Sequence, residues 1–177
     1  RSGELARQQL SLQFGGEVRN LTVLFTDIRD FTTYTERHPP QEVVHILREY
    51  LTTMAGQVIA NQGTLDKFIG DAVMALWGAP IAREDDAERA VRAALDLVDA
   101  VRGLGPGIQI RAGILTGEAT VTLGATNQGM VAGDIVNTAS RLQSAAAPST
   151  VLVGEATQRA AGGAIVFEAA DDQVLKG

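Results

Sequence analysis

Residues 21–32, LTVLFTDIRDFT, begin with apolar side chains at alternate positions and several β-branched residues, which predicts a strand. The strand ends near an acid, Asp27, and residues 32–37 then predict a short helix that stops before Pro39 and Pro40. Asp27 could hold a metal ion there, while the backbone amides of residues 28–31 bind phosphate. Taken alone, Asp27 could equally be a simple cap at the end of a strand.

The rest of the chain predicts a single layered fold. Apolar residues at helical spacing predict helices over residues 41–61, from 84–86 to 101, over 134–144 and over 155–160. Strands are expected at 64–69, 72–77, 108–115, 119–123 and 151–153, with a turn at 116–118 and residues 165–167 completing the body. Strands and helices interleave without a repeat, so we expect an α/β or α+β fold in which helices cover a sheet.

Length and composition narrow the range of partners. The 177 residues suffice for one domain with a real core, and 45% are hydrophobic. A net charge of −6 without a basic cluster argues against nucleic acid. Without cysteine there is no disulfide or thiolate metal site. The longest apolar run, residues 72–82, is too short to span a bilayer, and no signal peptide is visible, so we expect a cytoplasmic domain without direct membrane contact.

The first residues are expected to lie outside the domain. Residues 4–12 are weakly helical and Gly15-Gly16 breaks the pattern, so residues 1–17 form a linker or a helix entering from upstream. The domain itself should cover residues 18–177. A fusion to sensor or transmembrane segments is compatible with this arrangement.

A second acid changes the interpretation of Asp27. Asp71 follows Gly70 in the tight turn of the predicted hairpin 64–77, where it has no obvious structural purpose. Two carboxylates at neighbouring strand ends suit a two-metal clamp, and Mg²⁺ usually takes one or two carboxylates together with phosphate oxygens. The three acids at 84–86 are explained by the preference of acids for the first turn of a helix.

The segment 133–142, GDIVNTASRL, supplies a third set of polar groups. Asn137 and Arg141 are four residues apart and therefore share one face of the predicted helix. An amide beside a guanidinium could bind a ribose and a phosphoryl group, or the two residues could form an ordinary solvated pair.

Four segments together resemble a known family. FTDIRDFT (25–32), DKFIGDAVMALWG (66–78), RAGILTGEA (111–119) and GDIVNTASRL (133–142) are similar, in order and spacing, to the class III nucleotidyl cyclase catalytic domain. The resemblance covers residues 18–177. It implies an α+β fold with a ferredoxin-like antiparallel sheet covered by helices on one face, and a homodimer with two active sites at its interface. It also implies conversion of ATP to cyclic AMP and pyrophosphate, in a domain that lacks its last strand.

The resemblance further implies a role for individual residues. Asp27 and Asp71 match the acids that bind two Mg²⁺ or Mn²⁺ ions per site, with the Ile28 carbonyl as a further ligand. Asn137 matches the residue that orients the ribose, and Arg141 matches the arginine that stabilises charge on the transferred phosphoryl group. The substrate-binding residues implied are Lys67 for the purine, Met130 beside it, and Phe31, Thr32, Arg111 and Lys176 for the phosphates.

Two departures from the family pattern affect the expected activity. Met130 stands where adenylyl cyclases usually have Asp or Thr to accept a hydrogen bond from adenine, so base selection should be looser. Lys67 still favours ATP, because guanylyl cyclases typically carry Glu at that position. Asp30 stands where the family usually has Gly, and it either caps the following helix or places a negative charge near the triphosphate. The alternatives are a non-catalytic nucleotide-binding or dimerisation domain, and a cyclase with relaxed ATP/GTP selectivity.

Overall fold

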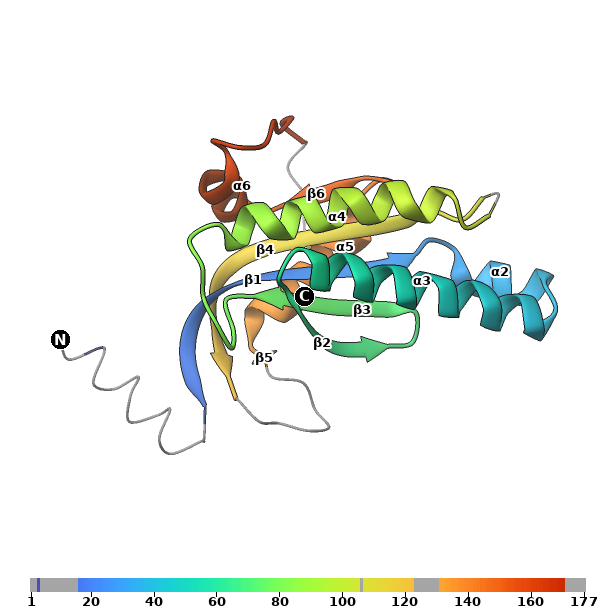
Figure 1. The fold of residues 1–177 in the computed structure, drawn as a ribbon, viewed down its shortest axis with the longest axis horizontal. Coiled ribbons are helices and arrows are strands. Elements are labelled where there is room, and N and C mark those ends of the chain that lie inside the picture. The colour runs from blue at the N-terminus through green and yellow to red at the C-terminus, as the bar shows by residue number, and fades with distance from the viewer. Residues whose placement is uncertain (1–2, 4–15, 106, 123–130, 171–177) are drawn as a thin grey trace.

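A computed structural model of the chain contains a six-stranded sheet built around one long strand, β1 (Glu17–Ile28) (Figure 1). The structure describes residues 3, 16–105, 107–122 and 131–170. The strands follow the order β2-β3-β1-β4-β5, and β6 also pairs with β4. All pairings are antiparallel except β4–β6, which is parallel. The other strands are β2 (Thr64–Ile69), β3 (Ala72–Trp77), β4 (Ile110–Val121), β5 (Val131–Ala132) and β6 (Val151–Val153).

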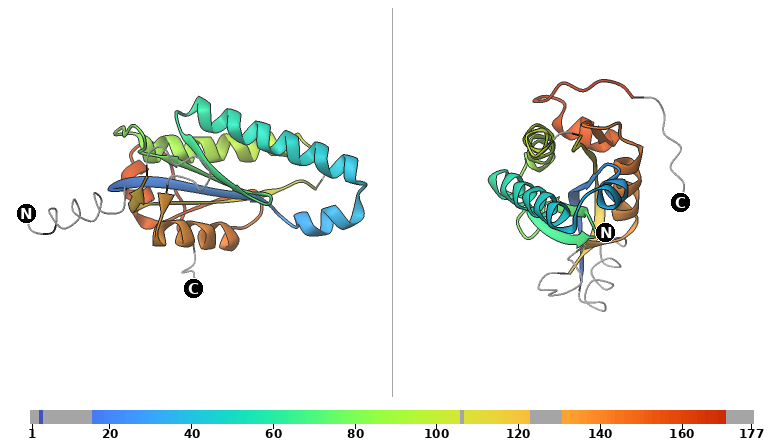
Figure 2. Two further views of the ribbon diagram at one scale, coloured as in Figure 1. Left: turned by 90° about the horizontal axis from the view of Figure 1, so that it is seen from below. Right: turned by 90° about the vertical axis from the view of Figure 1, so that its right-hand side faces the viewer.

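Helices cover both faces of this sheet (Figure 2). On one face, α3 (Pro40–Ala60) and α4 (Asp86–Arg102) pack on β1 residues such as Leu24 and Ile28. On the other face, α5 (Asp134–Ala145) packs on the alternate β1 residues, such as Val23. The expectation of helices on one face alone was therefore wrong. The described residues also form two short helices, α2 (Phe31–Arg37) and α6 (Glu155–Ala161).

Most predicted elements are confirmed within one or two residues, but β1 begins at Glu17, four residues before the predicted strand, and one predicted turn is absent. The predicted turn at residues 116–118 was wrong, because β4 continues through it and pairs Gly117 with Leu21 of β1. Glycine here does not break the strand but lies beneath Ile135 of α5. Residues 165–167 form no strand. Ile165 and Phe167 instead pack against the core while Val166 is exposed.

The close approach of α5 to the sheet depends on Gly113 of β4. A Cβ atom at this position would lie 2.3 Å from the backbone nitrogen of Gln143 and 2.8 Å from the carbonyl oxygen of Ala139. Both atoms belong to the α5 backbone, so no side-chain rotation could relieve the contact. Gly113 therefore fixes the distance between the helix and the sheet.

A β-bulge in β2 decides which face of the sheet Lys67 occupies. Leu65 pairs with Ala75 and Lys67 pairs with Met74, so Asp66 is an extra residue. Residues directly opposite each other share a face of the sheet. Ala75 belongs to the core under α3 and α4, whereas Met74 belongs to the core under α5. The bulge thus turns Lys67 to the α5 side.

Asp30 joins β1 to α2 in a left-handed conformation, with φ 54° and ψ 33°. Its side chain makes no capping hydrogen bond to α2, so the first of the two alternatives for Asp30 is not realised, and it forms an exposed ion pair with Arg29. A left-handed backbone is strained for residues with a Cβ and free of strain for glycine. This conformation gives a physical reason for glycine at such a position.

Among the residues that the structure describes, no helix has the length and apolar character needed to cross a bilayer.

We expect Gly113→Ala to destabilise the domain by roughly 2–3 kcal/mol, because α5 must move to make room for the methyl group. Gly56 in the interior of α3 provides the matched control, since a Cβ atom added there would have nothing within 4 Å. Gly56→Ala should stabilise the domain by roughly 0.5–1 kcal/mol through helix propensity. Denaturant unfolding measures both changes, and equal effects of the two substitutions would contradict the packing argument.

Asp30→Gly should stabilise the domain by roughly 0.5–1 kcal/mol, because relief of the left-handed strain exceeds the added entropy of the unfolded chain. The lost ion pair with Arg29 is exposed and adds little. Asp30→Ala separates backbone strain from charge, since alanine removes the carboxylate but keeps the Cβ. A gain in melting temperature from alanine equal to that from glycine would contradict the role of backbone strain.

Candidate active site

Asp27 and Asp71 meet at one end of β1. Asp27 is the penultimate residue of β1, and Asp71 lies in the turn between β2 and β3. Thr26 of β1 is opposite Val73 of β3 in an antiparallel pair, so the register brings Asp71 alongside Ile28. The Ile28 backbone also hydrogen-bonds to the Asp71 carboxylate. The structure thus brings together the predicted metal-binding residues Asp27, Ile28 and Asp71.

The two carboxylates influence each other electrostatically. Burial raises the pKa of Asp71 above its usual value, and the negative charge of Asp27 raises it further. Backbone hydrogen bonds and the positive charge of Arg111 oppose this rise in the Asp71 pKa. An ionised pair at this position is therefore unfavourable unless positive charge lies close by.

Arg111 of β4 supplies such a charge to Asp27. The two residues are directly opposite in the β1–β4 register. The distance from Arg111 Nη2 to Asp27 Oδ2 is 3.2 Å, and that from Nε to Oδ1 is 3.4 Å. Arg111, predicted to bind phosphate, therefore contacts a predicted metal ligand.

The residues present fit a divalent cation. Within the described ranges, no group of three or more His, Asp or Glu side chains could hold a metal ion, so the site offers two carboxylates. That donor set suits Mg²⁺ or Mn²⁺, which are oxygen-binding cations, and Mg²⁺ usually completes its coordination with substrate phosphates and water. A cation between the carboxylates would also remove the repulsion that raises the Asp71 pKa.

A buried pair of hydroxyl groups lies beneath the acids and was not foreseen in the sequence. Tyr50 of α3 and Thr26 of β1 are both fully buried, and their hydroxyl groups are hydrogen-bonded. Burial raises the Tyr50 pKa, and the nearby charges of Asp27 and Asp71 raise it further. A tyrosine at a buried helical position needs a partner for its hydroxyl group, which is the signal that could have pointed to Thr26.

A second group of predicted residues gathers on the α5 side of the sheet. Lys67 Nζ donates a hydrogen bond of 3.4 Å to the carbonyl oxygen of Val131, just before α5. Asn137 is exposed on the second turn of α5, and Arg141 is half-buried one turn later. Arg141 donates a long hydrogen bond of 3.4 Å to Thr138, and its buried Nε has no partner within the described residues.

The positions of the other predicted substrate-binding residues do not indicate a role in the site. Phe31 and Thr32 form the start of α2, with the Phe31 ring against the core and Thr32 exposed. Met130 and Lys176 lie outside the described residues. None of the hydrogen bonds or ion pairs of the described residues joins Asp27 or Asp71 to Lys67, Asn137 or Arg141. Among the described residues, polar contacts therefore tie the predicted site residues together only within each of the two groups.

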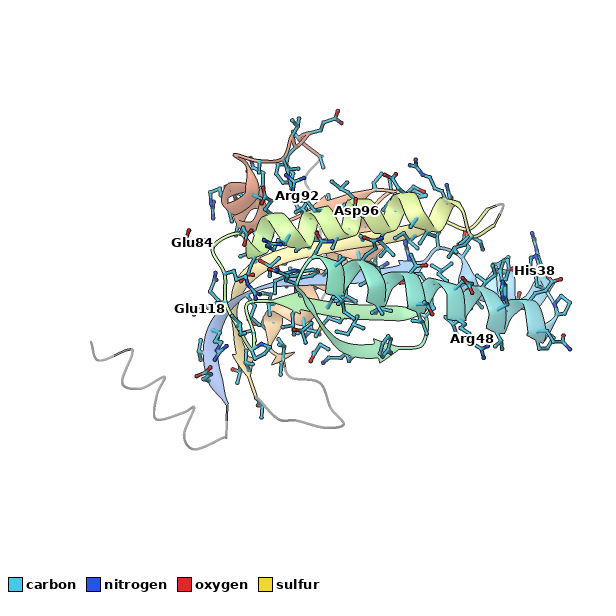
Figure 3. The ribbon with its side chains drawn as sticks, in the orientation of Figure 1. His38, Arg48, Glu84, Arg92, Asp96 and Glu118 are labelled. Atoms are coloured by element: carbon cyan, nitrogen blue, oxygen red, sulfur yellow. The ribbon has the colours of Figure 1, made fainter. Side chains whose placement is uncertain are left out.

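A pocket of about 520 Å³ is lined by none of the residues of either group. It is formed by α2, the start of α3 and the loop before β4, and both histidines of the chain line it. Figure 3 places His38 at the opposite end of the molecule from Glu118. The His38 ring stacks on Tyr34 at a centroid distance of 3.8 Å, which suits a structural role for this histidine.

Comparison with known proteins extends these observations. Residues 16–177 match the family model of the adenylate and guanylate cyclase catalytic domain. Adenylate cyclase 1 of Rhizobium meliloti (strain 1021) is 42% identical over 155 residues, which make up 79% of this chain but 23% of that protein. The chain thus spans about a quarter of the length of that relative.

Two solved structures have the same fold. The adenylyl cyclase CyaB from P. aeruginosa superimposes with a TM-score of 0.80 at 30% identity, covering 85% of this chain and 84% of that one. The guanylyl cyclase Cya2 gives a TM-score of 0.78 at 33% identity, covering 84% and 81% respectively. The sheet order, the positions of the motifs and these similarities agree, and the chain belongs to the adenylate and guanylate cyclase catalytic domain family.

Proposed function

We propose that this domain converts ATP to cyclic AMP and pyrophosphate at a site shared between two copies of the chain. The observation that carries the proposal is the pair Asp27 and Asp71 at the end of β1, together with a second group of Lys67, Asn137 and Arg141 on the α5 side. The similarity to Adenylate cyclase 1 supports ATP as the substrate.

The lack of polar contacts between the acids and the second group of residues supports a site shared by two copies of the chain. Within the described residues, no hydrogen bond or ion pair links the acids to Lys67, Asn137 or Arg141. One copy of the chain would therefore supply the acids of a site, and the second copy would supply the lysine, asparagine and arginine. Phe68 and Ile69, between Lys67 and Asp71 on the hairpin, are 55% and 56% exposed. Large apolar side chains exposed beside a site are typical of a surface that another chain covers.

The acids would hold Mg²⁺ or Mn²⁺, two ions per site, with the Ile28 carbonyl as a further ligand. When bound, such cations supply Lewis-acid activation of the ribose 3′-hydroxyl and neutralise phosphate charge. The 3′-oxygen attacks the α-phosphorus in line, the bond to the bridging oxygen breaks, and pyrophosphate leaves while the hydroxyl proton passes to solvent.

The α5 residues would act on the sugar and the phosphoryl group. Asn137 is exposed and can orient the ribose by hydrogen bonding. Arg141 has an unpartnered buried Nε within the described region and only one long hydrogen bond, so its guanidinium has unused donors for charge that develops on the phosphoryl oxygens.

Lys67 would select the base. Its bond of 3.4 Å to Val131 is weak, so the ammonium group can turn to an acceptor on the purine at little cost. Adenine N1 accepts a hydrogen bond, whereas guanine N1 carries a proton. With Met130 beside this position and a guanylyl cyclase among the similar structures, some turnover of GTP is also expected.

The purified domain should form cyclic AMP from ATP and Mn²⁺, as measured by chromatography of the products. Asp71→Ala and Arg141→Ala should each lower turnover by roughly 10³-fold or more, because one loses a metal ligand and the other loses charge stabilisation. Asp96→Ala and Arg92→Ala are matched controls on the outward side of α4 (Figure 3) and should retain activity. ATP binding without any product from the unmodified domain would favour a non-catalytic binding module instead.

Mixing the two inactive variants tests the shared site. A heterodimer of Asp71→Ala and Arg141→Ala has one site with both defects and one intact site, so activity should reappear on mixing. No recovery, in proteins shown to exchange subunits, would contradict the division of the site between two copies.

Asp71→Asn should stabilise the domain at neutral pH by roughly 1 kcal/mol, as expected when an unfavourable functional charge is removed. The folded-state pKa of Asp71 is raised, so protonated Asp71 favours folding, and this contribution is lost as pH rises through the folded pKa. The advantage of the asparagine variant should therefore disappear below the usual aspartate pKa. Metal-free denaturant unfolding at several pH values measures it, and a pH-independent difference would contradict the electrostatic origin.

A further inference from the structure

Arg111 donates hydrogen bonds to both carboxylate oxygens of Asp27. Its Nη2 and Nε groups point to different oxygens at 3.2 Å and 3.4 Å, which is a bidentate arrangement. The side chains are 26% and 19% exposed for Arg111 and Asp27, so this ion pair is better shielded from water than the pairs within α4 and α6 or between Arg29 and Asp30. Arg111 therefore neutralises the same oxygens that a metal ion would need.

The same guanidinium group also holds the end of α5. Arg111 Nη1 donates a hydrogen bond of 3.1 Å to the carbonyl oxygen of Ser144 in the last turn of the helix. Carbonyl groups of a last helical turn lack partners within the helix, and α5 has no basic residue of its own there. Arg111 thus links Asp27 to the helix that carries Asn137 and Arg141.

A divalent cation and a guanidinium group are both positively charged and compete for Asp27. A cation between Asp27 and Asp71 would lie close to Arg111, whose positive charge already acts on both carboxylates. When the cation binds, the Arg111 guanidinium group would lose its attraction to Asp27 and be repelled by the cation. A polyphosphate offers it a new bidentate partner, which a free metal ion does not.

We propose that Arg111 is an exchangeable counter-cation of the metal site, which holds Asp27 and the end of α5 in the metal-free domain and leaves Asp27 when the cation binds. The inference rests on the proposed metal-dependent function of Asp27 and Asp71. Metal alone then binds weakly because it must displace Arg111, and the metal–nucleotide complex binds more strongly. Arg111 acts here as a positioning residue for the metal ligand.

The first test is the affinity of the nucleotide-free domain for Mn²⁺, followed by electron paramagnetic resonance of the free ion. Arg111→Met should bind Mn²⁺ about tenfold more tightly than the unmodified domain, as expected for loss of a charge-assisted bidentate competitor. Arg29→Met is the matched control. Arg29 lies two residues after Asp27 and pairs with Asp30, so its removal deletes one nearby positive charge without freeing Asp27. Affinity should change less than about threefold in this control.

The second test keeps the native sequence, in case Arg111→Met folds poorly without its contact to α5. The Nε–H resonance of Arg111, identified by its absence in a variant or by labelling, is followed by NMR during titration with Mg²⁺ alone. We expect the signal to shift with the occupancy of the metal site, and the Ser144 region of α5 to respond with it. In Asp71→Asn, Mg²⁺ at the same concentrations should leave the Arg111 signal unchanged.

The outcomes separate this inference from the proposed function. An Arg111 signal that stays unchanged at saturating Mg²⁺ would overturn the exchange, as would Mn²⁺ affinities of Arg111→Met and Arg29→Met that are equal or both undetectable. A domain that forms cyclic AMP but shows either result is a cyclase without this exchange. A domain that releases Arg111 on binding metal but forms no cyclic nucleotide would support the exchange and refute the proposed activity.

Discussion

The antiparallel pairing of β1 with both of its neighbours is the constraint on which the site depends. The pairing with β4 extends from Glu17 to Ile28 and places Arg111 opposite Asp27, while the pairing with β3 brings Asp71 to Ile28. A slip of one residue in either ladder would move these side chains to the opposite face of the sheet. The apolar residues on both faces of β1 prevent such a slip, since each set is buried in its own core. The electrostatic pairings of Asp27 are therefore a consequence of core packing.

Two local features of the backbone determine how Lys67 and α5 lie against the sheet. Gly113 allows the α5 backbone to approach β4, and the bulge at Asp66 turns Lys67 away from the α3 side. Without the bulge, Lys67 would share a face with Leu65 beneath α3 and could not contact Val131. Lys67 thus lies against the residues just before α5, the helix that carries Asn137 and Arg141.

Local sequence patterns predicted the helices and strands well. They did not predict which residues far apart in the sequence contact each other. The alternation in residues 21–26 and the helical spacing in α3, α4 and α5 reflect burial, which acts residue by residue along the chain. The bond between Arg111 and Asp27 spans 84 residues and exists only through strand register. The bulge at Asp66 has no composition signature, and Gly117 resembles a turn residue until its partner on β1 is known. The helical spacing in α3 likewise gives no sign that the Tyr50 hydroxyl group bonds to Thr26 of β1.

The proposed metal site is built from charges that disfavour the metal-free fold. Asp27 and Asp71 repel each other, and the protein offsets this repulsion with Arg111 rather than by separating the acids. Such an arrangement lets a folded monomer exist before substrate arrives, because the buried charge is already compensated. On the α5 side, Arg141 retains an unpartnered nitrogen within the described region, which leaves a donor for a substrate. If the site is shared between two copies as proposed, one chain can be stable while its site is incomplete, and bringing two chains together becomes a point of control over activity.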